Sequence, residues 1–285
     1  MKTFKLPSFP EICVNFHLTN RCPFRCRYCH STFLEESPVS AHQWIEIFSK
    51  INQETEHIQF RKLTLSGGEP LLVKNMELIL ESAKDAGWQT GIISCGLNLS
   101  EEVIRTRLKD ADSIGVSVDS LDQNVNRLIG RSTLTGETVD YVGVCKLIKK
   151  LGKKLKINTV VHSLNWDQDL KPLLHSLKPD RVKFLQCRTD VDLRDRDFSG
   201  AVREDEYQKF VENQFYPEAV VESEILQSGS YIMLDPEGHL FDTVEGKRRK
   251  SPSLLGISFT EGMEYIYYDH QKFQARAGNY FSSLK

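Results

Sequence analysis

Three cysteines near the start of the chain have a spacing that suits a metal cluster. Cys22, Cys26 and Cys29 lie in the segment CPFRCRYC, which has the pattern C-x3-C-x2-C. Thiolates are the usual protein ligands of iron–sulfur clusters. Three thiolates on a four-iron cluster leave one iron open, and that iron could bind the amino and carboxylate groups of S-adenosylmethionine (SAM). A reduced cluster could then pass an electron to the sulfonium and break a carbon–sulfur bond.

A zinc site is the alternative interpretation of the same cysteines. His30 follows Cys29 directly and could be a fourth ligand, although two adjacent residues coordinate one ion awkwardly. Zinc sites also more often use paired C-x2-C units. The spacing therefore favours an iron–sulfur cluster and leaves zinc as the second hypothesis.

A second motif follows about forty residues later. Ser66, Gly67, Gly68 and Glu69 stand before a proline and after a predicted strand. Adjacent glycines let the backbone come close to a ligand, and the backbone and carboxylate groups there could hold an ammonium group. By itself this motif could equally be an ordinary strand-to-helix turn.

The remaining pattern alternates between strands and helices. Expected strands and helices follow one another from residue 12 to residue 186, which makes about six strand–helix units. This order predicts a parallel sheet in an open or barrel arrangement, with the site at the carboxyl ends of the strands. The cysteine loop, the motif at residues 66–70, Ser94 and residues 119–120 all follow predicted strands. A second hairpin-containing region, residues 191–285, is expected to close one side of the site.

The composition narrows the class of protein. The chain has 285 residues, a formal net charge of −2 and seven cysteines. This charge gives no reason to expect nucleic acid or an acidic membrane as a partner. An odd, clustered set of cysteines favours metal binding over disulfides and indicates a reducing compartment. Since no run of about eighteen apolar residues or secretory leader is apparent, a cytoplasmic protein without a membrane span is expected.

Together, the cysteine motif and the Gly-Gly-Glu-Pro segment closely resemble the radical SAM superfamily. Within it the chain resembles the viperins, through residues 15–19, 62–70, 129–131, 181–186 and 230–235 among others. The resemblance implies an α/β fold, a partial (β/α)6 TIM-like barrel over residues 1–190 with a C-terminal α+β extension. It also implies a [4Fe-4S] cluster and SAM as cofactors, and a one-electron donor such as flavodoxin or ferredoxin.

The resemblance further implies a reaction. Viperins convert a ribonucleoside triphosphate, typically CTP, to its 3′-deoxy-3′,4′-didehydro form, which terminates viral RNA synthesis in antiviral defence. The adenosyl radical removes the ribose 4′ hydrogen and the 3′ hydroxyl leaves as water. One electron and one proton complete the product. Tyr231 is expected either near that delivery step or, equally well, as an aromatic that packs on the extension.

Site residues are also implied. SAM is expected to contact the motif residues, two serines at strand ends and an arginine: Ser66, Gly67, Gly68, Glu69, Ser94, Ser117 and Arg131. A surface salt bridge is the alternative role for the arginine. The nucleotide is expected to bind Asn15, Lys62, Ser66, Lys156, Asn158, Arg181 and Lys183. Lys156 and Asn158 share strand parity, as do Arg181 and Lys183, so each pair should face one side of its strand. Cations facing inward would be costly without an anionic ligand.

Two departures from the family affect the substrate and the location. Animal viperins carry an amphipathic membrane helix that is not expected here, and an Asn-Cys pair where this chain has Asp242 and Thr243. CTP and UTP therefore both remain candidates, with GTP less favoured.

Another radical SAM enzyme with a different substrate is the main alternative, although no cysteine follows Cys187 to hold a further cluster. A zinc-binding protein without enzymatic activity is the more remote one. The basic run at residues 247–250 is expected to be a solvated loop or a cover for the phosphates.

Overall fold

The computed structural model describes residues 10–31, 38–189 and 198–278. The chain forms two compact units. The first unit consists of Met1–Arg21, Phe33–Ile92 and Leu226–Lys285, and the second of Cys22–Thr32 and Ile93–Ile225. The boundary that the sequence suggested, at residue 190, falls in a segment outside the described residues, so the predicted division into a barrel and an extension stays a prediction.

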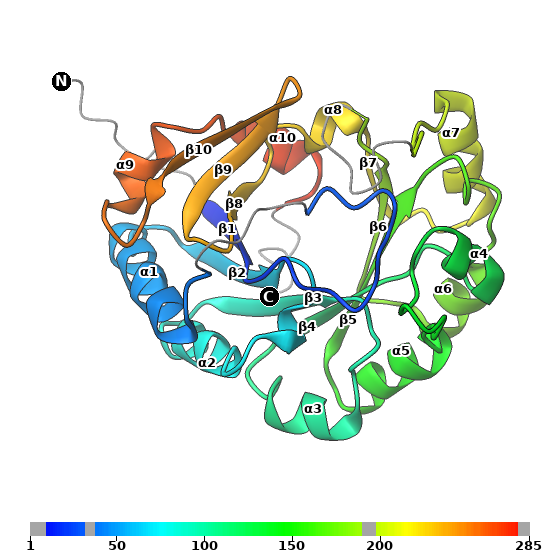
Figure 1. Cartoon of the computed structure of the whole chain (residues 1–285), viewed down its shortest axis with the longest axis horizontal. Helices are drawn as coiled ribbons and strands as arrows, with labels where there is room; N and C mark the ends of the chain where they lie inside the picture. Colours follow the sequence, from blue (N-terminus) through cyan, green and yellow to red (C-terminus); the bar gives the residue numbers. More distant parts are fainter. Residues whose placement is uncertain (1–9, 32–37, 190–197, 279–285) are drawn as a thin grey trace. The chain divides into compact units, whose positions relative to one another are not determined.

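The first unit is built on a sheet whose central strands are parallel (Figure 1). Strands β1 (Glu11–His17), β2 (Phe60–Ser66) and β3 (Gln89–Ser94) pair in that order, and β8 (Ile232–Leu234) pairs parallel to β1 on its other side. Strands β9 (His239–Val244) and β10 (Lys247–Ser253) continue the sheet in antiparallel fashion. The expected hairpin is therefore present, and the basic run lies on β10 instead of in a loop.

In the first unit, α1 (Ala41–Glu54) and α2 (Glu77–Asp85) cover one face of the parallel strands (Figure 1). The unit also contains η1 (Pro70–Leu72), α9 (Phe259–Met263) and α10 (His270–Ala275). Ser40 begins α1 with a capping box that it forms with Gln43. Trp44 of α1 stacks on Phe16 of β1 with ring centroids 4.5 Å apart, and both side chains are fully buried. Because Phe16 points outward to the helix, its neighbours Asn15 and His17 point to the opposite face.

The second unit carries four parallel strands. They are β4 (Ser113–Ser117), β5 (Lys154–Val161), β6 (Arg181–Gln186) and β7 (Val220–Glu222), paired in that order. The helices are α3 (Glu101–Thr106), α4 (Gln123–Leu128), α5 (Tyr141–Lys150), α6 (Lys171–Leu177) and α7 (Glu204–Asn213), and the short α8 (Glu224–Gln227) returns the chain to the first unit. Alternate residues of β5 are fully buried, so the others share the opposite face.

Most expected elements are confirmed, and the differences have local causes. Helix α6 starts only at Lys171, because Pro172 fits the first turn of a helix, where no backbone N–H donor is needed, and would break a helix that began several residues earlier. Strand β7 and helices α4, α8, α9 and α10 were not expected, since segments of three to six residues are too short to show a clear period. No helix among the described residues is long and apolar enough to cross a membrane.

Candidate active site

The three cysteines lie on one short loop at the start of the second unit. None of the three forms a disulfide with a described residue, and all three are half-buried. The loop curls back on itself, since the Cys29 amide donates to the Cys26 carbonyl at 3.2 Å. The Arg25 guanidinium also donates to the Cys22 carbonyl at 2.5 Å and to the Phe24 carbonyl at 3.0 Å. One short loop therefore carries the three thiols, as a single metal centre requires.

The segment after α4 holds this loop by its backbone. The amides of Arg25 and Arg27 donate to the carbonyls of Gly130 and Ile129 at 2.9 Å and 3.0 Å. Gly130 has a φ of 76°, and a Cβ on it would lie 2.1 Å from the Arg25 carbonyl oxygen. Glycine is therefore required at this position for two reasons: the left-handed backbone and the close approach of the loop.

Tyr28 anchors the loop in the core of the second unit. Its ring is 7% exposed and packs with Ile129, Cys187 and Phe198, and it stacks on His162 with centroids 4.9 Å apart. Its hydroxyl donates to the Asp119 carboxylate and accepts from Arg131 at 2.7 Å. Sequence reasoning placed Asp119 at the end of a predicted strand without giving it a role, and it did not single out Tyr28. The sequence did offer one signal for Tyr28. It is a large aromatic residue between two cysteines, at a position where a solvent-exposed loop would usually carry a polar residue.

The donor set fits an iron–sulfur cluster. Burial, opposed by the charge of Arg131 and reinforced by Cys29 and Asp119, raises the pKa of the Cys26 thiol to about 12. A thiolate at this place needs a compensating positive charge, which iron supplies. Among the described residues, neither His30 nor the three cysteines belongs to a group whose metal-binding atoms lie within 4.8 Å of one another. The preference for a cluster over zinc therefore rests on the spacing and type of the ligands.

The Gly-Gly-Glu-Pro motif lies against the chain that enters the cysteine loop. The amides of Gly68 and Glu69 donate to the carbonyls of Thr19 and Arg21 at 2.6 Å and 2.7 Å. A Cβ on Gly68 would lie 2.2 Å from the Arg21 oxygen, and one on Gly67 2.6 Å from the Thr19 oxygen. The glycines therefore admit a neighbouring backbone segment of the same unit, an approach that the sequence did not predict.

Glu69 and the predicted serines lie at strand ends. Glu69 is fully buried, and its carboxylate accepts the Leu71 amide at 3.2 Å, which caps the short helix η1. Ser66, Ser94 and Ser117 are the last residues of β2, β3 and β4. The Ser94 hydroxyl accepts the Gly96 amide at 3.0 Å, and the Ser117 carbonyl accepts from Arg131 at 3.1 Å. Their position agrees with a site at the carboxyl ends of parallel strands.

Four of the predicted nucleotide-binding residues form two adjacent rows in the second unit, one row on β5 and the other on β6. The register places Lys156 beside Arg181, and Asn158 beside both Lys183 and Ser117. The shared parity that the sequence suggested for each pair is confirmed on β5, where Lys156 and Asn158 alternate with fully buried residues. The Asn158 Oδ1 atom is buried and makes no hydrogen bond with any residue that the structure describes.

Lys183 also has an acidic partner within the second unit. Its ammonium forms an ion pair with Glu222 of β7, and the side chains are 5% and 0% exposed. The Tyr207 hydroxyl donates to the Phe184 carbonyl at 2.7 Å and lies 3.3 Å from the Glu222 carbonyl. Glu222 was not foreseen, because the three-residue strand that carries it was missed.

The first unit holds the other predicted nucleotide contacts. The Asn15 amide donates to the Ile232 carbonyl at 3.2 Å. Tyr231 immediately precedes β8, and the Arg276 guanidinium lies 3.6 Å from the centroid of its ring. Lys62 lines a cavity of about 130 Å³ with Glu11, Cys13 and Gln89, among other residues. The position of Lys62, early in β2, separates it from Ser66 at the far end of the same strand.

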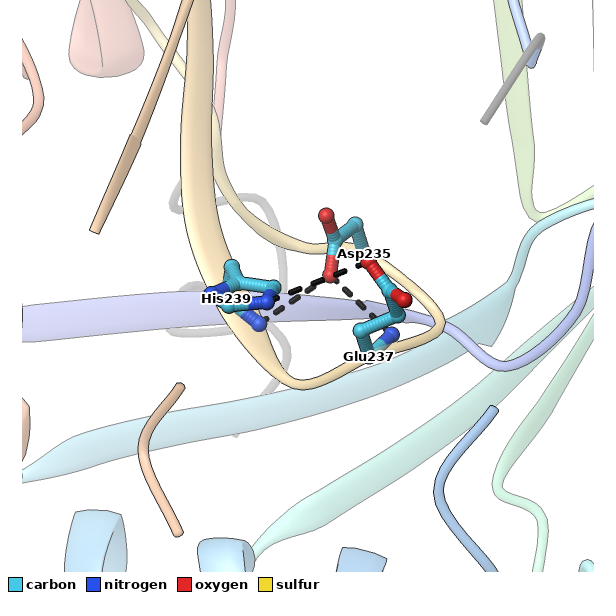
Figure 2. A group of neighbouring side chains, drawn as sticks. All are labelled: Asp235, Glu237 and His239. Atoms are coloured by element: carbon cyan, nitrogen blue, oxygen red, sulfur yellow. Dashed lines mark hydrogen bonds and ion pairs between the residues drawn. The ribbon is translucent and has the colours of Figure 1, made fainter. Parts of the chain in front are cut away.

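The hairpin contains a group of possible metal ligands. Asp235, Glu237 and His239 offer ligand atoms within 4.8 Å of one another (Figure 2). Asp235 already uses both oxygens, because Oδ1 accepts the amides of Glu237 and His239 at 3.1 Å each and Oδ2 lies 2.5 Å from the Lys250 ammonium. His239 Nδ1 is 2.8 Å from the Ser251 carbonyl. These contacts are those of an Asx-type turn, and they explain the group without a metal.

Asp242, one of the two residues that left both CTP and UTP as candidates, also makes polar contacts within the first unit. Its side chain is 1% exposed, and its carboxylate accepts the amides of Val244 at 3.2 Å and Tyr267 at 2.6 Å. Arg249 lies 3.9 Å from the same carboxylate. The aspartate therefore joins β9 and β10 to the segment before α10.

Comparison with known proteins identifies the class. Residues 16–177 match the model of the radical SAM superfamily. The fold is similar to that of native anSMEcpe with bound AdoMet, with a TM-score of 0.69 at 14% identity over 90% of this chain and 81% of that chain. The chain belongs to the radical SAM superfamily, and its fold is the expected partial TIM-like α/β barrel of that type.

Curated relatives narrow the family. An S-adenosylmethionine-dependent nucleotide dehydratase of Flammeovirga pacifica is 30% identical, over 94% of each chain. One of Lacinutrix mariniflava is 33% identical over 97% of this chain, which spans 59% of that relative's length. The RSAD2 protein of Oncorhynchus mykiss is 26% identical over 94% of this chain and 79% of that protein. Within the superfamily, the chain belongs to the viperin family of SAM-dependent nucleotide dehydratases, with SAM and a [4Fe-4S] cluster as its cofactors.

Proposed function

We propose that this chain dehydrates a ribonucleoside triphosphate, CTP or UTP, to its 3′-deoxy-3′,4′-didehydro form. The observation that carries the proposal is the pair of rows on β5 and β6, in which Lys156 lies beside Arg181 and Asn158 beside Lys183. Three cations on neighbouring strands form a site for several phosphates, which bind best to multiple charge-assisted donors. The buried Asn158 amide adds a polar group that a ligand can engage.

The remaining site residues are part of the same proposal. Cys22, Cys26 and Cys29 hold the cluster, which supplies the electron for reductive cleavage of SAM. The residues proposed to hold SAM are Ser66, Gly67, Gly68, Glu69, Ser94, Ser117 and Arg131. Asn15, Lys62 and Ser66 are further nucleotide-binding residues of the proposal. Tyr231 lies close to the place where the last proton and electron are delivered to the nucleotide.

The Lys183–Glu222 ion pair has a specific consequence for this site. A buried lysine without a partner would tend to lose its proton, whereas Glu222 favours the ammonium form before any phosphate arrives. Because the cations stand at separate positions on two neighbouring strands, a polyphosphate can contact more of them than a single phosphate group can.

The cellular setting is proposed on the family and composition. The electron donor is a small one-electron protein such as flavodoxin or ferredoxin, the location is the cytoplasm, and the role is antiviral defence through a chain-terminating nucleotide. Residues 191–285 serve as an extension that closes the nucleotide site. Neither nucleic acid nor a membrane is a partner.

An anaerobic assay tests the proposal. Reconstituted protein is incubated with SAM, dithionite and each of the four ribonucleoside triphosphates, and the products are read by mass spectrometry. A pyrimidine nucleotide lighter by one water, formed together with 5′-deoxyadenosine, is expected. The Cys26→Ala variant should give neither product. Cleavage of SAM without any change in the nucleotides would refute the substrate and favour a different radical SAM reaction.

A further inference from the structure

We infer that Asp119 is the positioning residue that fixes the cluster loop, acting through the hydroxyl of Tyr28 and the guanidinium of Arg131. The inference uses the three cysteines as cluster ligands and does not depend on which nucleotide is the substrate. Every contact that carries it lies within the second unit. Asp119 follows β4 after one residue, and Tyr28 lies 91 positions earlier in the chain.

Both carboxylate oxygens of Asp119 and its backbone carbonyl accept hydrogen bonds. Its side chain is fully buried, and Oδ2 accepts from the Tyr28 hydroxyl and, at 2.8 Å, from Arg131 Nε. Oδ1 accepts the Val160 amide of β5 at 2.8 Å. The Asp119 carbonyl accepts the Asn165 amide at 3.1 Å. A buried carboxylate with this many donors has one orientation, so it can impose that orientation on the residues that it binds.

Arg131 completes the connection and ties the loop to β4. Its side chain is 6% exposed. One guanidinium nitrogen donates to the Ser117 carbonyl at 3.1 Å and another to the Tyr28 hydroxyl at 2.7 Å, while the ion pair with Asp119 measures 2.8 Å. The charges of Asp119 and Arg131 compensate each other, which a buried pair requires. The salt bridge that was the alternative role for Arg131 is thus a buried one, and it holds the guanidinium beside the end of β4.

The contacts of Asp119 and Arg131 with Tyr28 affect the cluster ligands, because Tyr28 is close to two of them along the chain. Tyr28 stands directly before Cys29 and two residues after Cys26, and the side chain of Cys26 packs on the same small core as the Tyr28 ring. A rotation of the Tyr28 ring would therefore displace two of the three thiols. Since the ring is held at its edge by packing and at its tip by Asp119 and Arg131, the position of both thiols is set by residues that do not touch the metal.

A pair of matched variants tests this inference. Tyr28→Phe removes one buried hydroxyl and keeps the ring, and Tyr207→Phe makes the same change at another buried tyrosine of the second unit, whose hydroxyl donates to the Phe184 carbonyl at 2.7 Å. Asp119→Asn removes the charge at similar size. Each protein is reconstituted anaerobically, and iron content, thermal unfolding and the EPR spectrum of the reduced cluster are recorded during a titration with SAM.

The inference predicts a difference between the two tyrosines. Tyr28→Phe should keep its fold but give a heterogeneous EPR spectrum, and it should need about tenfold more SAM for half of the spectral change, because a hydrogen bond to charged groups is lost. Tyr207→Phe should match the wild type in both readouts while losing a comparable amount of thermal stability. Asp119→Asn should lose iron as well.

Two outcomes would overturn the inference. If Tyr28→Phe shows the wild-type spectrum and the wild-type SAM titration, the hydroxyl network contributes only to the stability of the core. If both tyrosine variants change the spectrum equally, the effect is a general loss of rigidity. Should Asp119→Asn fail to fold, the comparison of the two tyrosine variants still decides. None of these readouts requires a nucleotide, so they stand even if the proposed substrate is wrong.

Discussion

The carbonyl of Arg21 lies directly against Gly68, so the Gly-Gly-Glu-Pro motif and the residue before the first cluster cysteine are in contact through their backbones. The Glu69 amide donates to that carbonyl at 2.7 Å. Both atoms belong to main chain, which cannot move aside as the end of a long side chain can. The motif thus fixes where the chain enters the cysteine loop.

Gly68→Ala should therefore destabilise the protein and reduce cluster incorporation. The added Cβ would lie 2.2 Å from the Arg21 oxygen, and the resulting backbone shift should lower the free energy of unfolding by more than about 2 kcal/mol. Urea unfolding and iron content measure both effects. Gly256→Ala in the same unit is the matched control, since its nearest neighbouring atom would be 3.7 Å away. Equal behaviour of the two variants would contradict the steric argument.

Glu222→Gln should be strongly destabilising. It leaves the Lys183 ammonium buried without its carboxylate, and breaking a buried pair in this way costs about 3–5 kcal/mol. The control is Asp169→Asn, whose pair with Lys171 is exposed at 38% and 54% and should contribute less than about 1 kcal/mol. Chemical unfolding of the cluster-free proteins measures both. A Glu222→Gln variant as stable as the control would show that Lys183 is solvated or neutral.

Lys156→Gln should weaken nucleotide binding selectively. Loss of one charge-assisted contact to a phosphate is expected to raise the KM for the triphosphate by roughly ten- to a hundredfold, with a smaller change in kcat. The exposed Lys146 of α5 gives a matched control, Lys146→Gln. Steady-state kinetics with the triphosphate, repeated with the monophosphate, provide the measurement. An unchanged KM would remove Lys156 from the phosphate site.

The stability of the second unit should depend on pH through His162. Burial lowers the pKa of this imidazole from 6.5 to about 4. Between these values the unfolded chain binds a proton that the folded chain does not, so the free energy of unfolding falls as the pH drops from about 6.5 toward 4. The difference between wild type and His162→Gln should shrink by about 2 kcal/mol from pH 7.5 to pH 5. Urea unfolding of cluster-free protein checks this, and a constant difference would contradict it.

The sequence predicted local features well and long-range contacts poorly. The cysteine spacing, the strand ending at Ser66 and the parity of Lys156 with Asn158 follow from neighbouring residues, and the structure agrees. The bond between Tyr28 and Asp119 joins positions 91 residues apart, and no period or motif encodes it. Glu222 was missed for a related reason, because its strand is only three residues long.

The glycine pair shows a different kind of limit. Two adjacent glycines indicate that something comes close, but the residue type does not say what. In the structure the approaching atoms are the carbonyls of Thr19 and Arg21. Similarly, the basic run at residues 247–250 did not reveal its acidic partners, Asp235 and Asp242, which come from the neighbouring turn and strand.

The most direct test of the central claim is the fate of the ribose 4′ hydrogen. Reconstituted protein would be incubated anaerobically with SAM, dithionite and CTP or UTP that carries deuterium at C4′. The account predicts a nucleotide that has lost its 3′ hydroxyl and its 4′ deuterium, together with 5′-deoxyadenosine that contains one deuterium. Unlabelled 5′-deoxyadenosine with an intact nucleotide would contradict the account.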